Sequence, residues 1–154
     1  MTTVLIAVDG TEESHLAARR AKELFGDRAH YLVVAVAEPV PPVMTPAPVE
    51  TVLPPDPEVV EAMAEQAEAD AHEAALEDMQ SVDPEILVGE GDPVGVLCAT
   101  AERRNVDVIV VGSHERSWFS RFLDPPVRDR LVRSAPCSVL VVRTPKAAGE
   151  HRKH

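Results

Sequence analysis

The chain has 154 residues, of which 45% are apolar and 27% charged, a mixture typical of one folded domain with an aliphatic core. No apolar run reaches the roughly 18 residues of a membrane span, and no basic segment precedes the first apolar run, so we expect a cytoplasmic protein without a membrane partner. The net charge is −11, and residues 29–102 hold 16 acids without one Lys or Arg. This balance disfavours nucleic acid as a partner. It suits a solvated acidic helix or contacts between oppositely charged surfaces.

Two apolar runs near the N-terminus predict strands that are buried on both faces, at residues 4–8 and 31–36. Between them, Thr11 is placed to cap a helix, with acidic residues in its first turn and Gly26 at its end. The chain therefore begins with a strand, a helix and a second strand.

Eight prolines between Pro39 and Pro57 predict a long loop without regular structure at 37–57. Asp56 then resembles an N-cap that is followed by a first-turn proline. Apolar residues recur at helical spacing beyond it, so we expect a long acidic helix to about Gln80.

The second half of the chain continues the alternation of strands and helices. We expect strands at 85–88, 106–111 and 139–142, a helix that opens at Asp92-Pro93, and a last helix from Asp124-Pro125 to about Arg133. Five strands and four helices in this order predict an α/β fold, with a parallel sheet covered on both faces and right-handed crossovers. Ligands bind such sheets at the carboxyl edge where the strand order reverses, which we place at Asp9 and Gly112 after the first and fourth strands.

One domain at 1–144 accounts for these elements, followed by a polar tail at 145–154 that is expected to be disordered. Cys98 and Cys137 show neither CxxC spacing nor clustered His partners, so we interpret them as buried structural thiols. The sequence shows no cluster that would indicate a metal or redox site.

Four local strings carry a resemblance to a known family. They are Val-Leu-Ile-Ala-Val-Asp-Gly-Thr-Glu-Glu-Ser from Val4, Gly-Asp-Pro from Gly91, Asp-Val-Ile-Val-Val-Gly-Ser-His from Asp107 and Arg-Ser-Ala-Pro-Cys-Ser-Val-Leu-Val-Val-Arg from Arg133. With these strings the chain resembles the universal stress protein family along nearly its whole length. The resemblance implies the adenine nucleotide alpha hydrolase-like fold, a three-layer sandwich with a five-stranded parallel sheet in the order 3-2-1-4-5.

The resemblance also implies a homodimer in which the last strands pair edge to edge. An exposed aliphatic edge strand favours such pairing, although a covering tail would protect the same edge. The residues that would form this edge are Val139, Leu140, Val141 and Val142.

The phosphate-binding motif of the ATP-binding branch is altered in this chain. That branch carries Gly-x-x-Gly, about nine intervening residues and then Gly-Ser or Gly-Thr, which let backbone N–H groups approach the phosphates. Gly112 and Ser113 match, but Glu115 stands at the second glycine, and Pro125 and Pro126 stand where Gly-Ser would follow. Glu115 adds negative charge and proline has no N–H to donate, so canonical binding of ATP is expected to be lost.

The nucleoside half of the site matches the family better. Asp9 also suits a plain structural role, as a carboxylate that accepts hydrogen bonds in the turn after its strand, and any buried strand would place a valine at Val36. A nucleoside or another uncharged ligand stays compatible with this half. The resemblance places the ligand-binding positions at Asp9, Val36, Gly112, Ser113 and Val127.

These observations predict a stress-response protein that acts by contact with protein partners, without catalysis and without a cofactor. The alternative is a sensor that binds an adenine or cyclic nucleotide in an altered pose, with Arg116 or Arg121 replacing the lost donors. His114 has no nucleophile elbow beside it that would indicate hydrolysis. Trp118-Phe119 is expected to seal the vacated pocket, to anchor a partner or to pack against the proline-rich loop.

Overall fold

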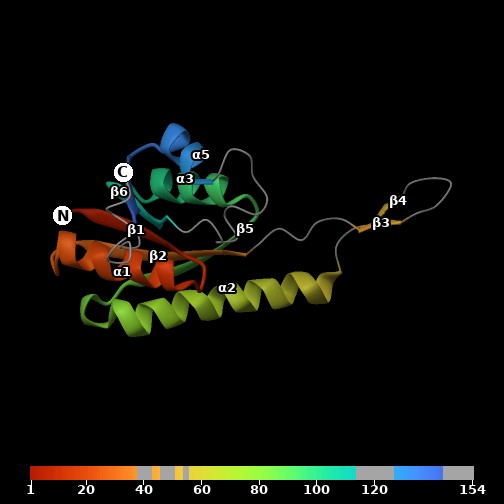
Figure 1. Cartoon of the computed structure of the whole chain (residues 1–154), viewed down its shortest axis with the longest axis horizontal. Coiled ribbons are helices and arrows are strands. Elements are labelled where there is room, and N and C mark those ends of the chain that lie inside the picture. The colour runs from red at the N-terminus through yellow and green to blue at the C-terminus, as the bar shows by residue number, and fades with distance from the viewer. Residues whose placement is uncertain (38–42, 46–50, 54–55, 114–126, 144–154) are drawn as a thin grey trace, which may run out of the picture.

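Five strands of the protein form one parallel sheet in the order β5-β2-β1-β6-β7 (Figure 1). The computed structural model describes residues 1–37, 43–45, 51–53, 56–113 and 127–143. Counted without the separate β3–β4 pair, the order is 3-2-1-4-5, so the predicted fold class is confirmed. The elements are β1 (Thr3–Val8), α1 (Glu12–Phe25), β2 (His30–Ala37), β3 (Val43–Thr45), β4 (Thr51–Leu53), α2 (Pro57–Asp78), a 3-10 turn (Gln80–Val82), β5 (Glu85–Glu90), α3 (Pro93–Arg103), β6 (Val108–Gly112), α5 (Val127–Ser134) and β7 (Ser138–Val142).

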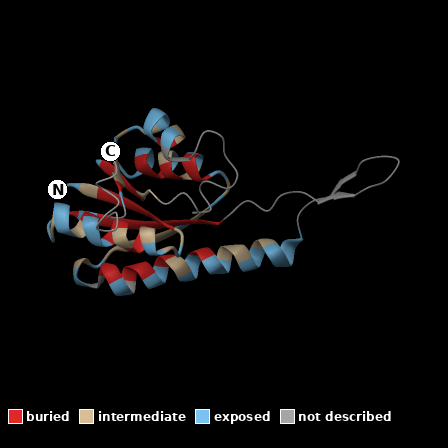
Figure 2. Cartoon of the chain, viewed as in Figure 1, coloured by how far each residue is buried: buried red, intermediate tan, exposed pale blue. Residues whose placement is uncertain are grey.

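The sheet lies between two helical layers, and each face has its own apolar core. Successive side chains of a strand point to opposite faces, so Ile6 of β1 packs on the side of α1 and α2, whereas Leu5 packs on the side of α3 and α5. Figure 2 shows the central strands buried and the outward faces of the helices exposed. The helices of the first layer contribute mainly alanine, including Ala17, Ala18 and Ala71, which lets them lie close to the sheet.

Short polar side chains begin the helices as the sequence predicts. Thr11 accepts a hydrogen bond from the Ser14 backbone N–H, Asp56 from that of Glu58, and Asp92 from that of Gly95. Each cap satisfies a backbone donor that has no partner inside its helix.

The proline-rich segment contains more regular structure than the sequence predicts. Within 37–57, β3 and β4 pair as an antiparallel ladder in which Val43 faces Leu53 and Thr45 faces Thr51. The prediction of a continuous loop was therefore wrong. Prolines border these triplets but do not enter them, and each triplet holds β-branched residues, so a short ladder forms between the prolines.

One strand begins later than the sequence predicts, and one predicted helix start is not tested. The fourth strand of the main sheet begins at Val108, because the Val106 N–H donates to the Ala101 carbonyl and closes the end of α3. The predicted start of the last helix at Asp124-Pro125 lies outside the described residues, within which α5 begins at Val127.

The two cysteines are free thiols that lie partly buried against the core on the α3 side. Burial raises the pKa of both the Cys98 and the Cys137 thiol above the ordinary value. Both thiols therefore favour the protonated form that suits a structural role. Among the described helices, none has the length and apolar character needed to cross a bilayer.

Candidate functional site

The turn between β1 and α1 holds Asp9 at the carboxyl edge of the sheet. Its Oδ1 accepts hydrogen bonds from the Thr11 backbone N–H at 3.1 Å and from the Thr11 hydroxyl, and its own N–H donates to Ser14 Oγ at 3.3 Å. Asp9 thus has the structural role that the sequence analysis left open. Its Oδ2 has no hydrogen-bond partner among the described residues, and the residue is half-buried.

Gly112 ends β6, the strand that pairs with β1, so Gly112 and Asp9 follow neighbouring strands at one edge as predicted. A Cβ at Gly112 would lie 2.9 Å from the Glu13 carbonyl oxygen, which shows how closely the first turn of α1 approaches β6. The Ser113 N–H donates to the Val142 carbonyl at 3.0 Å. That N–H is therefore engaged in holding β7 beside β6.

Val36 lies on β2, on the other side of β1, and only 4% of it is exposed. It packs in the core on the α3 side, with Leu5, Val94 and Leu97 in the same cluster. Packing alone thus accounts for a valine at this position, and its role in a ligand pocket stays a prediction.

The altered positions of the phosphate motif fall on residues that are not described. Val127 opens α5, but its side chain is also outside the description. The predictions for this part of the site therefore stay predictions. The positions concerned are His114, Glu115, Arg116, Trp118, Phe119, Arg121, Asp124, Pro125 and Pro126.

Asp70 of α2 is a residue of this edge that the sequence analysis missed. Gly10 has a φ of +78°, and a Cβ there would lie 2.8 Å from Asp70 Oδ1, so Asp70 covers the turn that follows Asp9. Burial raises the pKa of the Asp70 carboxyl, and the negative charges of Asp9 and Glu73 raise it further, whereas the hydrogen bond from Gln66 acts in the opposite direction. Asp70 is therefore a carboxylate whose charge is disfavoured where it lies.

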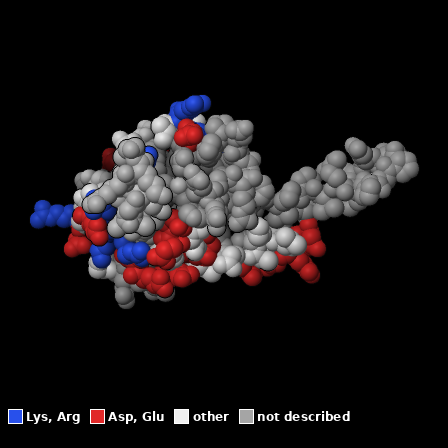
Figure 3. Space-filling model, in the orientation of Figure 1, with Lys and Arg blue, Asp and Glu red and all other residues white. Residues whose placement is uncertain are grey.

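Two carboxylates lie beside Gly10 at this edge, and the backbone of a third acidic residue lies against Gly112. Asp9 and Asp70 flank Gly10, and Glu13 lies against Gly112, where a glycine Cβ would be 3.4 Å from the Glu13 Cβ. Figure 3 shows that acidic side chains also extend along α2. Such an edge suits hydroxyl or amino donors of a ligand and repels anions.

A separate groove of about 400 Å³ lies beside α3, and its lining includes Gly89, Val96 and Arg103. It borders β5, which is separated from β1 by β2. This groove is therefore distinct from the crevice predicted at Asp9 and Gly112.

A model of the universal stress protein family matches residues 1–143 of the chain. The chain belongs to the universal stress protein family. A universal stress protein of Methanocaldococcus jannaschii is 37% identical over 57 residues, which is 37% of this chain and 34% of that protein. The match thus spans about a third of the length of this curated relative.

Solved structures of universal stress proteins share the fold. One in complex with cAMP is 23% identical, with a TM-score of 0.56 over 92% of this chain and 95% of that chain. Another, from Arabidopsis thaliana with AMP bound, is 19% identical, with a TM-score of 0.60 over 94% of this chain and 93% of that chain. The predicted family and fold are therefore confirmed.

Proposed function

We propose that this universal stress protein works by contact with partners and without catalysis, and that its carboxyl edge binds ATP poorly. The observation that carries the weak binding of ATP is the pair of carboxylates, Asp9 and Asp70, beside Gly10 at the carboxyl edge of the sheet. Like charges that share a partly buried edge raise the free energy of a bound triphosphate.

The sequence beyond the described edge supports the same proposal. Pro125 and Pro126 remove two backbone donors from the family's phosphate motif, and Glu115 adds a further carboxylate. A charge-assisted hydrogen bond contributes about 1.5 to 3 kcal/mol, so the loss of two weakens binding by roughly two to four orders of magnitude.

A second candidate function is a sensor of adenine nucleotides, in which Arg116 or Arg121 replaces the lost donors. The solved relatives with cAMP and with AMP favour it. So does Asp9 Oδ2, which accepts no hydrogen bond from the part of the chain that the structure describes and suits the hydroxyl donor of a ribose.

A calorimetric titration with adenosine, AMP, cAMP, ADP and ATP, each with and without magnesium, separates these functions. We expect that added phosphates do not increase affinity and that ATP binds no more tightly than about millimolar, near 4 kcal/mol. Micromolar affinity for ATP would overturn the proposal, whereas selective binding of AMP or cAMP would establish the sensor.

A variant that restores the phosphate motif tests whether the altered residues are the cause of weak ATP binding. In Glu115→Gly/Pro125→Gly/Pro126→Ser the glycines and the serine of the ATP-binding branch return, and we expect affinity for ATP to rise at least tenfold, about 1.4 kcal/mol. The matched control Glu38→Gly/Pro41→Gly/Pro42→Ser makes the same chemical changes in the proline-rich segment and is expected to leave the affinity for ATP unchanged. If both variants bind ATP as weakly as the parent, the altered motif is not the cause.

A further inference from the structure

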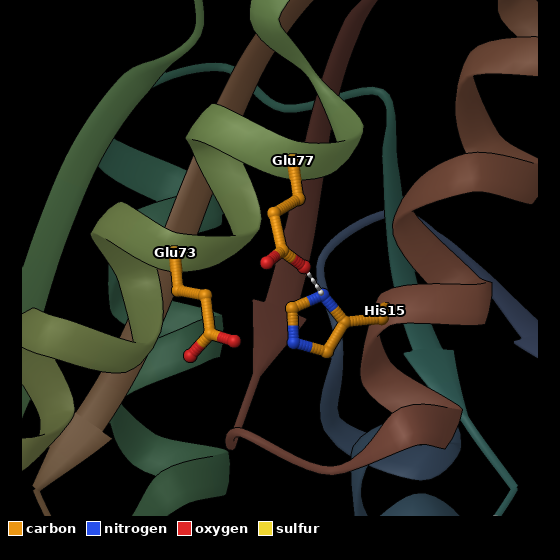
Figure 4. Close-up of side chains that lie close together, drawn as sticks. All are labelled: His15, Glu73 and Glu77. Atoms are coloured by element: carbon orange, nitrogen blue, oxygen red, sulfur yellow. Dashed lines mark ion pairs between the residues drawn. The ribbon is translucent and has the colours of Figure 1, made fainter.

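Helices α1 and α2 bring together three potential metal ligands that the sequence analysis did not connect. One ring nitrogen of His15 and one carboxylate oxygen from each of Glu73 and Glu77 lie within 4.8 Å of one another. Figure 4 shows both carboxylates beside the imidazole, with Glu73 and Glu77 one turn apart on α2. The cluster lies between the two helices.

The imidazole of His15 is held in a fixed orientation by Asp78. Nδ1 of His15 lies 2.6 Å from Asp78 Oδ2, and 8% and 3% of the two side chains are exposed. The second oxygen of Asp78 accepts a hydrogen bond from Arg19 at 3.1 Å, which fixes the carboxylate in turn. When Nδ1–H donates to Asp78, the lone pair of Nε2 is left without a hydrogen-bond partner among the described residues.

A carboxylate that accepts from one ring nitrogen of a histidine is the usual support of a histidine that binds metal through the other. From this arrangement we propose that His15 Nε2, Glu73 and Glu77 form a binding site for a divalent transition metal of the zinc type, with water completing the coordination. One imidazole and two carboxylates are donors that zinc accepts in tetrahedral sites. Magnesium favours oxygen ligands and retains several waters, so it fits this set less well.

Both carboxylates must move to close around an ion bound at Nε2. Zinc binds nitrogen and oxygen ligands at about 2.0–2.2 Å, so atoms that are up to 4.8 Å apart must approach one another by roughly 1–1.5 Å. Glu77 Oε2 lies 3.8 Å from His15 Nδ1, the nitrogen that faces Asp78, so this carboxylate must also turn toward Nε2. The side chain of Glu77 is 61% exposed and that of Glu73 is exposed as well, so both can change rotamer. The buried His15 supplies the fixed point.

Electrostatics favour a cation at this place. Two carboxylates at i and i+4 on a helix repel each other, and a bound divalent ion replaces this repulsion with attraction. The ion would also connect α1 to α2 and stabilise the layer that covers β1.

The test is a calorimetric titration of the full chain with zinc at pH 8, on protein purified without a histidine tag. We expect that Glu73→Gln/Glu77→Gln weakens zinc binding at least tenfold. The matched control Glu61→Gln/Glu65→Gln removes two exposed acids with the same spacing on the same helix and is expected to bind like the parent. Magnesium at the same concentrations is expected to bind at least tenfold more weakly than zinc.

A second measurement assigns the ligand nitrogen. Zinc is expected to shift the NMR signals of the His15 ring and to raise the unfolding temperature of the parent but not of the Gln pair. Equal zinc affinity in the parent and the Gln pair would overturn the site and assign binding to other histidines, such as His72 beside Glu68. Absence of zinc binding at millimolar concentration, or equal affinity for magnesium, would overturn it as well.

Discussion

Gly112 at the end of β6 packs against the first turn of α1, and this close contact leaves no room for a side chain. A Cβ there would lie 2.9 Å from the Glu13 carbonyl oxygen, a backbone atom that cannot turn aside. We expect Gly112→Ala to displace α1 and to lower the free energy of unfolding by about 1–3 kcal/mol, measured by urea denaturation without any ligand.

Gly95 in α3 provides the control for this substitution. A Cβ there would meet Asp92 Oδ2 at 3.4 Å, in ordinary contact, and alanine favours a helix. Gly95→Ala is expected to leave stability unchanged or to raise it by up to about 1 kcal/mol. If Gly112→Ala is as stable as the parent, close packing does not explain this glycine and a ligand role becomes the better reason for it.

Asp70 makes the stability of the protein depend on pH. Because burial, Asp9 and Glu73 raise its pKa in the folded state, the ionised carboxylate destabilises the fold, fully at pH values above the folded pKa. We expect Asp70→Asn, which keeps an acceptor for Gln66, to raise the free energy of unfolding at pH 7 by about 0.5–1 kcal/mol. This gain in the free energy of unfolding should fade as the pH falls through the folded pKa of Asp70, and it should vanish below the ordinary carboxyl pKa of about 4.

Unfolding of both proteins by urea at several pH values measures this difference. Glu65→Gln removes a charge from an exposed position of the same helix and is expected to give a smaller, nearly pH-independent change. A gain from Asp70→Asn that persists at pH 3 would show that the substitution acts through packing and not through charge.

Strands were the elements that the sequence predicted best. Aliphatic runs such as 4–8 and 31–36 are buried on both faces of a parallel sheet, so a continuous apolar run marks them directly. The β3–β4 pair was missed because each strand has only three residues, too few for a period to emerge among prolines.

The candidate site could be predicted only where it follows the strand ends. Topology placed Asp9 and Gly112 at one edge, because parallel strands that are neighbours end together. The position of Asp70 over Gly10, and of His15 beside Glu77, depends on how α1 packs against α2, which no local pattern encodes. The sequence position of Asp78 did indicate a buried ion pair. It lies four residues after Ala74, on the buried stripe of α2, where a charged side chain requires a partner.

In the whole molecule, strand β7 forms one of the two edges of the sheet. Within the described residues it pairs with β6 on its inner side and with no strand on its outer side. Val139, Leu140 and Val141 are half-buried there, with apolar surface that a second copy would cover. We expect the 16.7 kDa chain to form a dimer through this edge, because unpaired backbone groups and aliphatic side chains favour the addition of a strand. Light scattering after size-exclusion chromatography would measure the mass.

Substitution of the edge distinguishes this dimer from other contacts. A lysine in place of Val141 brings a charge to the interface, so Val141→Lys is expected to weaken dimerisation at least tenfold, about 1.4 kcal/mol. Val132 on α5 is 58% exposed, and the same change there, Val132→Lys, is expected to leave the dimer intact. Circular dichroism would verify that both variants fold. A parent that is monomeric at high concentration, or a folded Val141→Lys that dimerises like the parent, would exclude β7 as the interface.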